Sequence, residues 1–219
     1  MKIELHHRTR DIWCTLSLDD DRKALASMIP FLNAEEIDAM KMTAYQADKL
    51  PNAVFALAHL ESLFFIDCQA LSGIPSSISR FEHLQELGFV ACADFGDLEG
   101  ISELDALRAL HVGSCPNFDG PPDELGKCKA LELMDLSHNL ALKRLNVSIL
   151  PPSLRIVDLR GCYQLELDDL PDTAWPKLCS LNASDWTLRG DLPADPVDNI
   201  GTKMKHLCTR HKGGAFEAD

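Results

Sequence analysis

The chain of 219 residues lacks any apolar run close to the roughly 18 residues that a membrane-spanning helix needs. Its first residues, MKIELHHRTRDIW, carry charges where a secretion signal would have its apolar segment. We therefore expect a soluble protein that stays in the cytoplasm. No G-x-x-x-x-G-K-[ST] phosphate-binding loop or other cofactor motif occurs, so we expect no cofactor.

Basic residues are also scarce, with 21 Lys and Arg against 34 Asp and Glu and a net charge of −13. This charge keeps a chain soluble and opposes binding to phosphate backbones or anionic lipid surfaces. We therefore expect neither nucleic acid nor a membrane as the main partner. Hydrophobic residues (46%) and charged residues (25%) occur in ordinary globular proportions, so the chain can bury a core.

The pattern L-x-x-L-x-L-x-x-C recurs along the chain in steps of 23 or 24 residues. Four copies begin at Leu60, Leu84, Leu107 and Leu154, and a fifth, which begins at residue 131, ends on Asn139. Degenerate copies continue the same steps at both ends: Leu178/Leu181/Ala183, Ile37/Met40/Met42/Tyr45 and Trp13/Leu16/Leu18. Period and pattern together are those of a leucine-rich repeat.

The second and third apolar residues of each copy lie two positions apart, which puts their side chains on one side of a strand. One repeat cannot bury its own apolar face, so neighbouring repeats should stack and their strands should form a parallel sheet. The residue that ends each copy should point inward and satisfy backbone groups that the turn leaves unpaired. These ladder residues, which we expect to be structural and reduced, are Cys68, Cys92, Cys115, Asn139 and Cys162.

The segments between the predicted strands, such as LPNAVFALAHL and IPSSISRFEHL, space their apolar residues by three or four, which indicates short helical turns. The combined string, L-P-x-x-I-x-x-L-x-x-L-x-x-L-x-L-x-x-C, resembles the repeats of plant intracellular immune receptors and of leucine-rich repeat effectors of plant-associated bacteria. The resemblance extends from about Leu50 to Trp186. It implies an α/β fold, a right-handed leucine-rich repeat solenoid with a parallel β-sheet on the concave face and short helices and loops on the convex face.

Three regions are predicted. Residues 1–49 would form an N-terminal cap with one or two degenerate repeats, residues 50–190 the leucine-rich repeats, and residues 191–219 a C-terminal capping helix and tail. In the first region, Asp20 and Asp21 precede an apolar helix face, and Pro30 should end or kink that helix. In the last region, Asp195 and Pro196 have the residue types that begin a helix.

The residues between the apolar positions of each strand face outward on the concave sheet and supply the candidate binding site. Phe64, Ile66 and Val90 are predicted to form an apolar spot beside Gly88. A mixed charged surface should follow it, made of Arg108, His111, Asp135, His138, Arg155, Asp158 and Arg160. Exposed apolar side chains beside arginines are typical of protein-binding surfaces. The alternative is that a loop covers Phe64 and the charges only solvate the sheet.

Two catalytic or metal-binding hypotheses compete with this interpretation. Asp135 and Asp158 should lie about 4.8 Å apart beside His111, a set that could perform acid–base chemistry or hold a divalent ion. A flat, solvated sheet nevertheless offers no pocket that excludes water. Cys208, between His206 and His211, could be a zinc ligand or the thiol nucleophile of a cysteine enzyme, but the second ligand pair of a structural zinc site is lacking and a capping helix that carries these residues is the more ordinary interpretation. We therefore expect no enzyme and no metal.

The sequence predicts a non-enzymatic, monomeric module that binds a partner protein through the concave face of its repeats. An alternative is a bacterial effector, delivered into a host cell, or a ubiquitin-ligase adaptor that presents a target to an enzymatic complex. The repeat pattern does not identify the partner, because a solenoid surface is a template that many partners fit.

Overall fold

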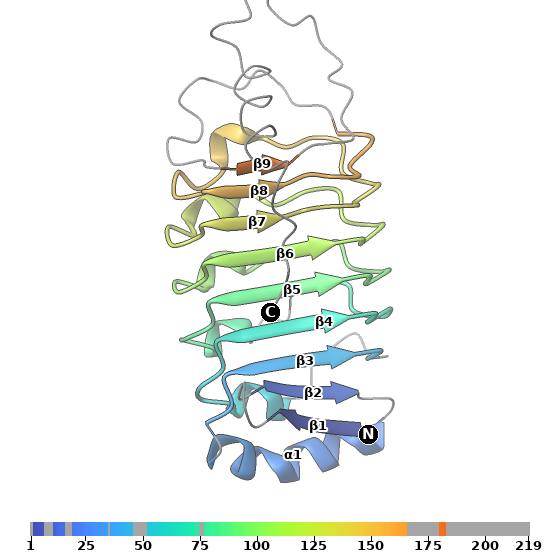
Figure 1. Ribbon diagram of the computed structural model, residues 1–219, viewed down its shortest axis with the longest axis vertical. Coiled ribbons are helices and arrows are strands. Elements are labelled where there is room, and N and C mark those ends of the chain that lie inside the picture. The colour runs from blue at the N-terminus through green and yellow to red at the C-terminus, as the bar shows by residue number, and fades with distance from the viewer. Residues whose placement is uncertain are drawn as a thin grey trace, which may run out of the picture.

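The computed structural model describes residues 2–6, 11–15, 19–34, 36–45, 52–74, 77–165 and 180–182. Its strands form one nine-stranded sheet in which each strand pairs with the next one along the chain (Figure 1). The strands are β1 (Lys2–His6), β2 (Asp11–Thr15), β3 (Ala39–Thr43), β4 (Ser62–Ile66), β5 (Glu86–Val90), β6 (Ala109–Gly113), β7 (Leu133–Asp135), β8 (Ile156–Asp158) and β9 (Ser180–Asn182). This order is that of a solenoid, in which every coil of chain adds one strand.

The register of the sheet confirms the repeat from β3 onward. All neighbouring strands from β3 to β9 are parallel, and equivalent residues of successive repeats lie opposite one another. Leu63, Leu87 and Leu110 form one such row, and Phe65 lies opposite Phe89 in the next. These side chains are fully buried, so each repeat does cover the apolar face of its neighbour. The predicted parallel solenoid is therefore confirmed.

The repeat predicted to begin at Trp13 is wrong in position. β2 pairs with β3 so that Ile12 lies opposite Met40, a spacing of 28 residues (12 to 40). β2 ends at Thr15, so it does not include the predicted apolar positions Leu16 and Leu18, which lie outside the described residues. The helix α1 (Asp19–Ala34) occupies the connection between β2 and β3 and lengthens it beyond the regular period. β1 pairs with β2 in the antiparallel sense, so the described chain starts with a β-hairpin.

The helix α1 does not end at Pro30 but continues to Ala34. Proline removes the backbone N–H that would bond to the carbonyl of Ala26. Both residues are exposed, so water can satisfy that carbonyl and the helix can continue. On its inner side, Ile29 and Leu32 are buried in the same core as the repeats.

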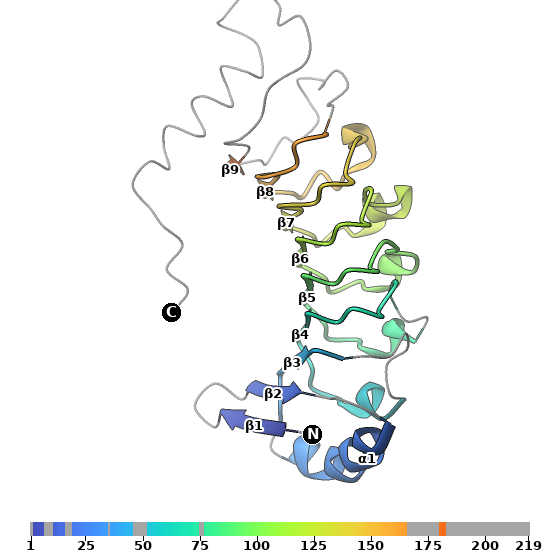
Figure 2. The same ribbon diagram turned by 90° about the vertical axis from the view of Figure 1, so that its right-hand side faces the viewer.

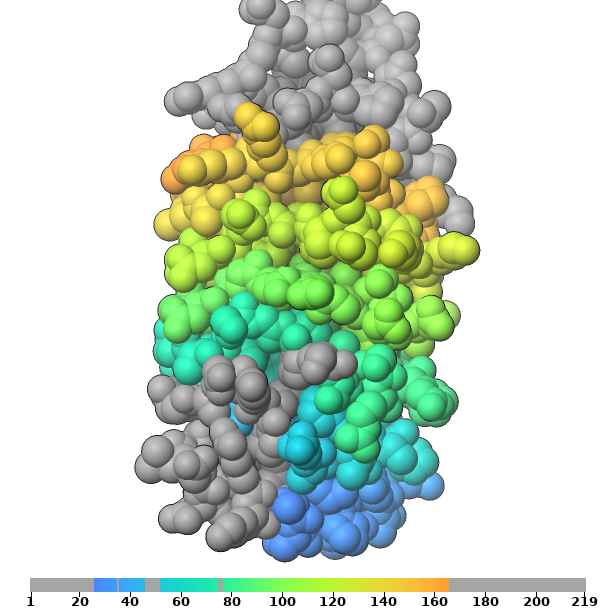
Figure 3. All heavy atoms as spheres, turned by 180° about the vertical axis from the view of Figure 1, so that it is seen from behind, coloured from blue at the N-terminus to red at the C-terminus, as the bar shows by residue number. Residues whose placement is uncertain are grey.

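Short 3-10 helices connect the strands, as the spacing of apolar residues predicts. They are η1 (Asn52–Ala56), η2 (Ile78–Arg80), η3 (Ile101–Glu103), η4 (Asp123–Lys127) and η5 (Val147–Ile149). Figure 2 shows the sheet along one side of the solenoid and these helices along the other. Seen from behind, the helical side is a stack of bands in chain order (Figure 3). The strands thus leave one face of the sheet uncovered by helices.

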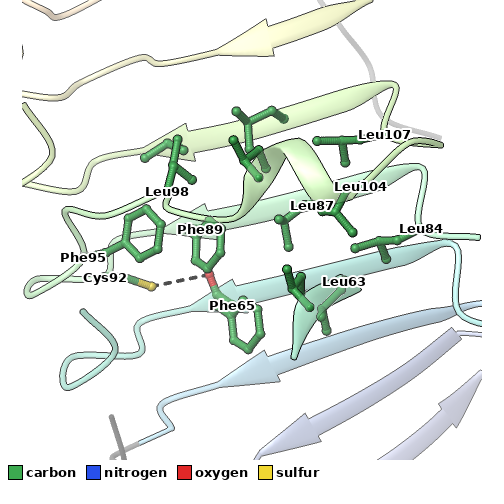
Figure 4. Close-up of a cluster of buried hydrophobic side chains, with 14 of the residues drawn as sticks. Leu63, Phe65, Leu84, Leu87, Phe89, Cys92, Phe95, Leu98, Leu104 and Leu107 are labelled. Atoms are coloured by element: carbon green, nitrogen blue, oxygen red, sulfur yellow. Dashed lines mark hydrogen bonds between the residues drawn. The ribbon is translucent and has the colours of Figure 1, made fainter. Parts of the chain in front are cut away.

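The core between the two sides is apolar and aromatic. Phe89 stacks on Phe65 and on Phe95, with ring centroids 5.2 and 3.9 Å apart, and Phe95 stacks on Phe118. Figure 4 shows the rings of Phe65, Phe89 and Phe95 together with leucines of successive repeats. The same figure shows the ladder residue Cys92 donating to the carbonyl oxygen of Phe65 at 3.6 Å.

All five ladder residues are buried and point inward, as predicted. Each thiol lies at hydrogen-bond distance from a carbonyl of the preceding repeat: Cys68 from Met42, Cys92 from Phe65, Cys115 from Phe89 and Cys162 from Leu136. Asn139 makes more bonds than the thiols, because its amide both donates and accepts. The ladder cysteines are free thiols in the structure.

The predicted C-terminal region, residues 191–219, lies outside the described residues, and so does Cys208 with its neighbouring histidines. The division into cap, repeats and C-terminal helix therefore stays a prediction.

Candidate binding surface on the sheet

The candidate site occupies the face of the sheet that the 3-10 helices leave uncovered. Its central row runs through the middle residues of successive strands: Phe64, Gly88, His111, Asp135 and Asp158, each opposite the next. The prediction that these residues lie in file is confirmed. Because side chains alternate along a strand, the flanking leucines point into the core while this row points outward.

Phe64 and His111 are in contact, although β5 lies between their strands. The two rings have their centroids 5.4 Å apart. Gly88 makes this possible, because a Cβ atom at that position would overlap the ring of Phe64. The phenylalanine therefore lies across the glycine and reaches the histidine two strands away. The apolar spot and the charged surface, predicted as separate zones, are in contact through this pair of rings.

His111 lies between two carboxylates. Its Nε2 is 3.2 Å from Oε1 of Glu86, and its Nδ1 is 3.8 Å from Oδ2 of Asp135. Glu86 also accepts a hydrogen bond from the hydroxyl of Ser62 at 2.8 Å. Asp135 accepts one from the backbone N–H of Ser137 at 2.9 Å. Four successive strands, β4 to β7, thus contribute to a single polar network.

This arrangement sets the charge of His111. Burial disfavours the imidazolium, but the nearby carboxylates of Asp135 and Glu86 outweigh burial and raise the pKa of His111 to about 9. The hydrogen bond from His111 lowers the pKa of Glu86. Burial opposes ionisation of Asp135, yet the nearby His111 and the hydrogen bond from the backbone N–H of Ser137 lower the pKa of Asp135. The histidine is therefore a fixed cation at neutral pH rather than a sensor of physiological pH.

Glu86 is the member of this network that the sequence reasoning missed. Glu86 comes directly before Leu87, the second apolar residue of its repeat. The outward row predicted from sequence contains only the residue directly after it, Gly88. The signal was nevertheless present, because residues two apart on a strand share one face. Glu86 and Gly88 therefore both face outward, on either side of the inward Leu87.

The remaining predicted site residues lie around this network. Arg160 binds the carboxylate of Asp158, with Nη2 2.6 Å from Oδ2, and its backbone N–H also donates to Asp158. Ile66 and Val90 lie opposite each other at the ends of β4 and β5 and are half-buried.

Three more predicted residues are exposed at the rims of the sheet. Arg108 and Arg155 precede β6 and β8, and Arg155 lies 3.9 Å from Glu132. His138 follows β7 in a left-handed backbone conformation, with φ at 59°. The structure therefore brings the central row together and places these three residues at its margins.

Neither a metal centre nor a membrane span is found in the part of the chain that the structure describes. No three His, Cys, Asp or Glu side chains there are grouped so that they could hold a metal ion. No described helix is both long and apolar enough to cross a bilayer. Asp135 and Asp158 do lie opposite each other, but their partners are His111 and Arg160.

Solved structures with the same architecture are leucine-rich repeat proteins. Human trophoblast glycoprotein is similar at 16% identity over 83% of this chain and 69% of that chain, with a TM-score of 0.54. Listeria monocytogenes InlP is similar at 17% identity over 80% of this chain and 49% of that one, with a TM-score of 0.51. The repeat domain of the Xanthomonas type III effector XopL has 20% identity over 79% of this chain and 75% of that one, with a TM-score of 0.45.

The chain is therefore a leucine-rich repeat protein in fold, as its sequence predicts. No protein-family model matches it, and a comparison with curated proteins finds no relative. It spans 46% of a similar Leptospira interrogans leucine-rich repeat protein and 30% of a similar plant peptide hormone receptor. These likenesses concern the fold alone.

Proposed function

We propose that this chain is a non-enzymatic recognition module that binds a partner protein through the uncovered face of its sheet. The contact between Phe64 and His111 carries the proposal. An aromatic ring that is only half-buried, on a surface of fixed charges, combines the apolar anchor and polar surroundings of protein-binding hot spots.

The site is also preorganised. Gly88 leaves room for the ring of Phe64, and two carboxylates hold His111. The pair of Asp158 and Arg160 is held by several hydrogen bonds. Side chains that are already fixed lose little conformational entropy when a partner binds, which favours affinity. We propose further that the module acts as a monomer in a reducing compartment such as the cytoplasm, which suits its buried free thiols.

Substitutions on the sheet test this function. The purified chain is used to capture proteins from a cell lysate, and the captured proteins are quantified by mass spectrometry. We expect Phe64→Asp and Arg160→Glu each to abolish capture of the specific partner without changing the circular dichroism spectrum. Phe31→Asp and Lys127→Glu are matched controls, because both residues are exposed and lie off the sheet.

Full capture by both sheet variants would show that the face is assigned wrongly. Loss of capture in both control variants as well would show that the effect is not specific to the sheet. Capture of a ubiquitin-ligase subunit by the sheet face would favour the adaptor alternative over a stand-alone module.

A further inference from the structure

A second surface lies on the loops that follow β7 and β8, beyond the site residues His138 and Arg160. Leu140 and Tyr163 are 49% and 65% exposed, and with Phe31 they are the exposed large hydrophobic residues of the described chain. Each directly follows a ladder residue, Asn139 or Cys162, so the two occupy equivalent positions in successive repeats. Stacked repeats place such positions side by side, about 5 Å apart.

The charge of this edge is opposite to that of the chain. Residues 136–165 contain four Lys and Arg; Arg155 and Arg160 lie beside the carboxylates of Glu132 and Asp158, so Lys143 and Arg144 are the cations that remain for this edge. Residues 91–124, by contrast, contain eight Asp and Glu and one Arg. The loop of Leu140 carries Lys143 and Arg144, and both are exposed. Among the described residues, no carboxylate forms an ion pair with either of them.

The charge changes from negative to positive at equivalent positions of two successive repeats. Asp119 follows the buried Phe118 in one repeat, and Lys143 follows the buried Leu142 in the next. The backbone holds these loops close together, since a Cβ atom at Gly120 would lie 3.3 Å from the carbonyl oxygen of Arg144. Two exposed apolar residues at equivalent positions of successive repeats thus share this edge with two cations that no described carboxylate pairs, in a chain of net charge −13.

We propose that the Leu140–Tyr163 edge, which consists of Leu140, Lys143, Arg144 and Tyr163, is a second docking surface that takes an acidic segment of a partner protein with an apolar anchor. The apolar pair receives the anchor, and the two cations attract the acidic residues around it. Charge complementarity speeds encounter and selects the partner, while burial of the anchor supplies affinity. A basic partner lacks the charge that this edge attracts, and a partner without an apolar residue lacks the anchor.

The test uses the full chain, labelled with ¹⁵N and followed by NMR. The probe is a synthetic peptide of four glutamates around one leucine and one phenylalanine. A control peptide carries glutamines in place of the glutamates. We expect the acidic peptide to shift the backbone signals of Leu140 and Tyr163 and to bind at least fivefold more weakly in 0.5 M than in 0.05 M NaCl, because salt screens exposed charges. The control peptide should bind at least fivefold more weakly than the acidic one.

Variants of exposed residues localise the effect without endangering the fold. Tyr163→Ala and Arg144→Glu should each weaken binding of the acidic peptide about fivefold or more. Lys127→Glu, which removes an exposed cation on η4, should change binding less than twofold. Signal shifts confined to other residues, equal binding of both peptides, or equal loss in Lys127→Glu would overturn the proposal. So would self-association of the chain that Tyr163→Asp abolishes, since the edge would then bind a second copy.

Discussion

Asn139 provides a direct test of the ladder that holds the repeats together. Its amide nitrogen donates to the carbonyl oxygens of Val112 at 2.6 Å and Leu136 at 2.9 Å. Its amide oxygen accepts from the backbone N–H of Cys115 at 2.9 Å. The residue is fully buried, so water cannot replace these bonds after substitution. We therefore expect Asn139→Ala to be strongly destabilising.

The size of the destabilisation follows from the backbone groups that lose their hydrogen bonds to Asn139. The carbonyl of Leu136 keeps a second donor, the thiol of Cys162 at 3.0 Å. The N–H of Cys115 and the carbonyl of Val112 both lose the bond that Asn139 provides. A buried polar group without its bond costs about 1–3 kcal/mol, so Asn139→Ala should lower the free energy of unfolding by about 3–5 kcal/mol.

Two further variants should destabilise the fold less than Asn139→Ala. Asn139→Cys restores a donor toward Val112, as the other ladder thiols do, but not the acceptor for Cys115, so it should cost about 1–3 kcal/mol. Cys92→Ala removes a weak thiol donor and should cost about 1 kcal/mol.

Urea unfolding followed by circular dichroism gives the three free energies, with the dependence on urea concentration as a check on cooperativity. If Asn139→Ala costs no more than Cys92→Ala, the amide of Asn139 does not bridge the repeats.

Two glycines and one histidine give further predictions. Gly88→Ala should abolish the contact of Phe64 with His111 but leave stability nearly unchanged, because the phenylalanine ring can turn away into solvent. Loss of the ring-current shift on the His111 imidazole in NMR spectra would show that the contact is lost. Gly126→Ala should lower the free energy of unfolding by about 1–3 kcal/mol, because its Cβ atom would overlap the backbone carbonyl oxygen of Ile149, which cannot turn away. Urea unfolding measures this, and equal stability of the two alanine variants would contradict the prediction. The pKa of His111 is raised in the folded chain, so its protonation stabilises the fold fully below pH 6.5, and this stabilisation is lost as the pH rises through about 9. Wild type should therefore lose roughly 1–3 kcal/mol relative to His111→Gln between pH 6.5 and 9.5, and a constant difference across this range would refute it.

The repeats could be predicted from sequence because their signal is periodic and local. Leu63, Phe65 and Cys68 recur at fixed spacing, and the period itself determines which residues lie opposite in the sheet. The first coil could not be predicted in the same way. There the connection contains a full helix, α1, so counting back from Met40 by one period misses the strand that contains Ile12.

The site could be predicted only in part. Its outward row follows from the alternation of side chains, which is why Phe64 and His111 could be named from sequence. The contact between them could not, because it depends on the direction of the Phe64 ring and on the room above Gly88. The role of Glu86 likewise depends on a distance between neighbouring strands rather than on the residue itself.

The pKa of His111 tests most directly whether the uncovered face of the sheet is one connected and preorganised site. NMR titration of the imidazole Cε1–H signal measures it in the wild-type chain and in Glu86→Gln. We predict a pKa of about 9 for the wild type and a lower value for the variant, because one of the two carboxylates that hold the proton is lost. A pKa near 6.5 that Glu86→Gln leaves unchanged would mean that strands β5 to β7 do not bring these groups together, and the proposed binding surface would lose its basis.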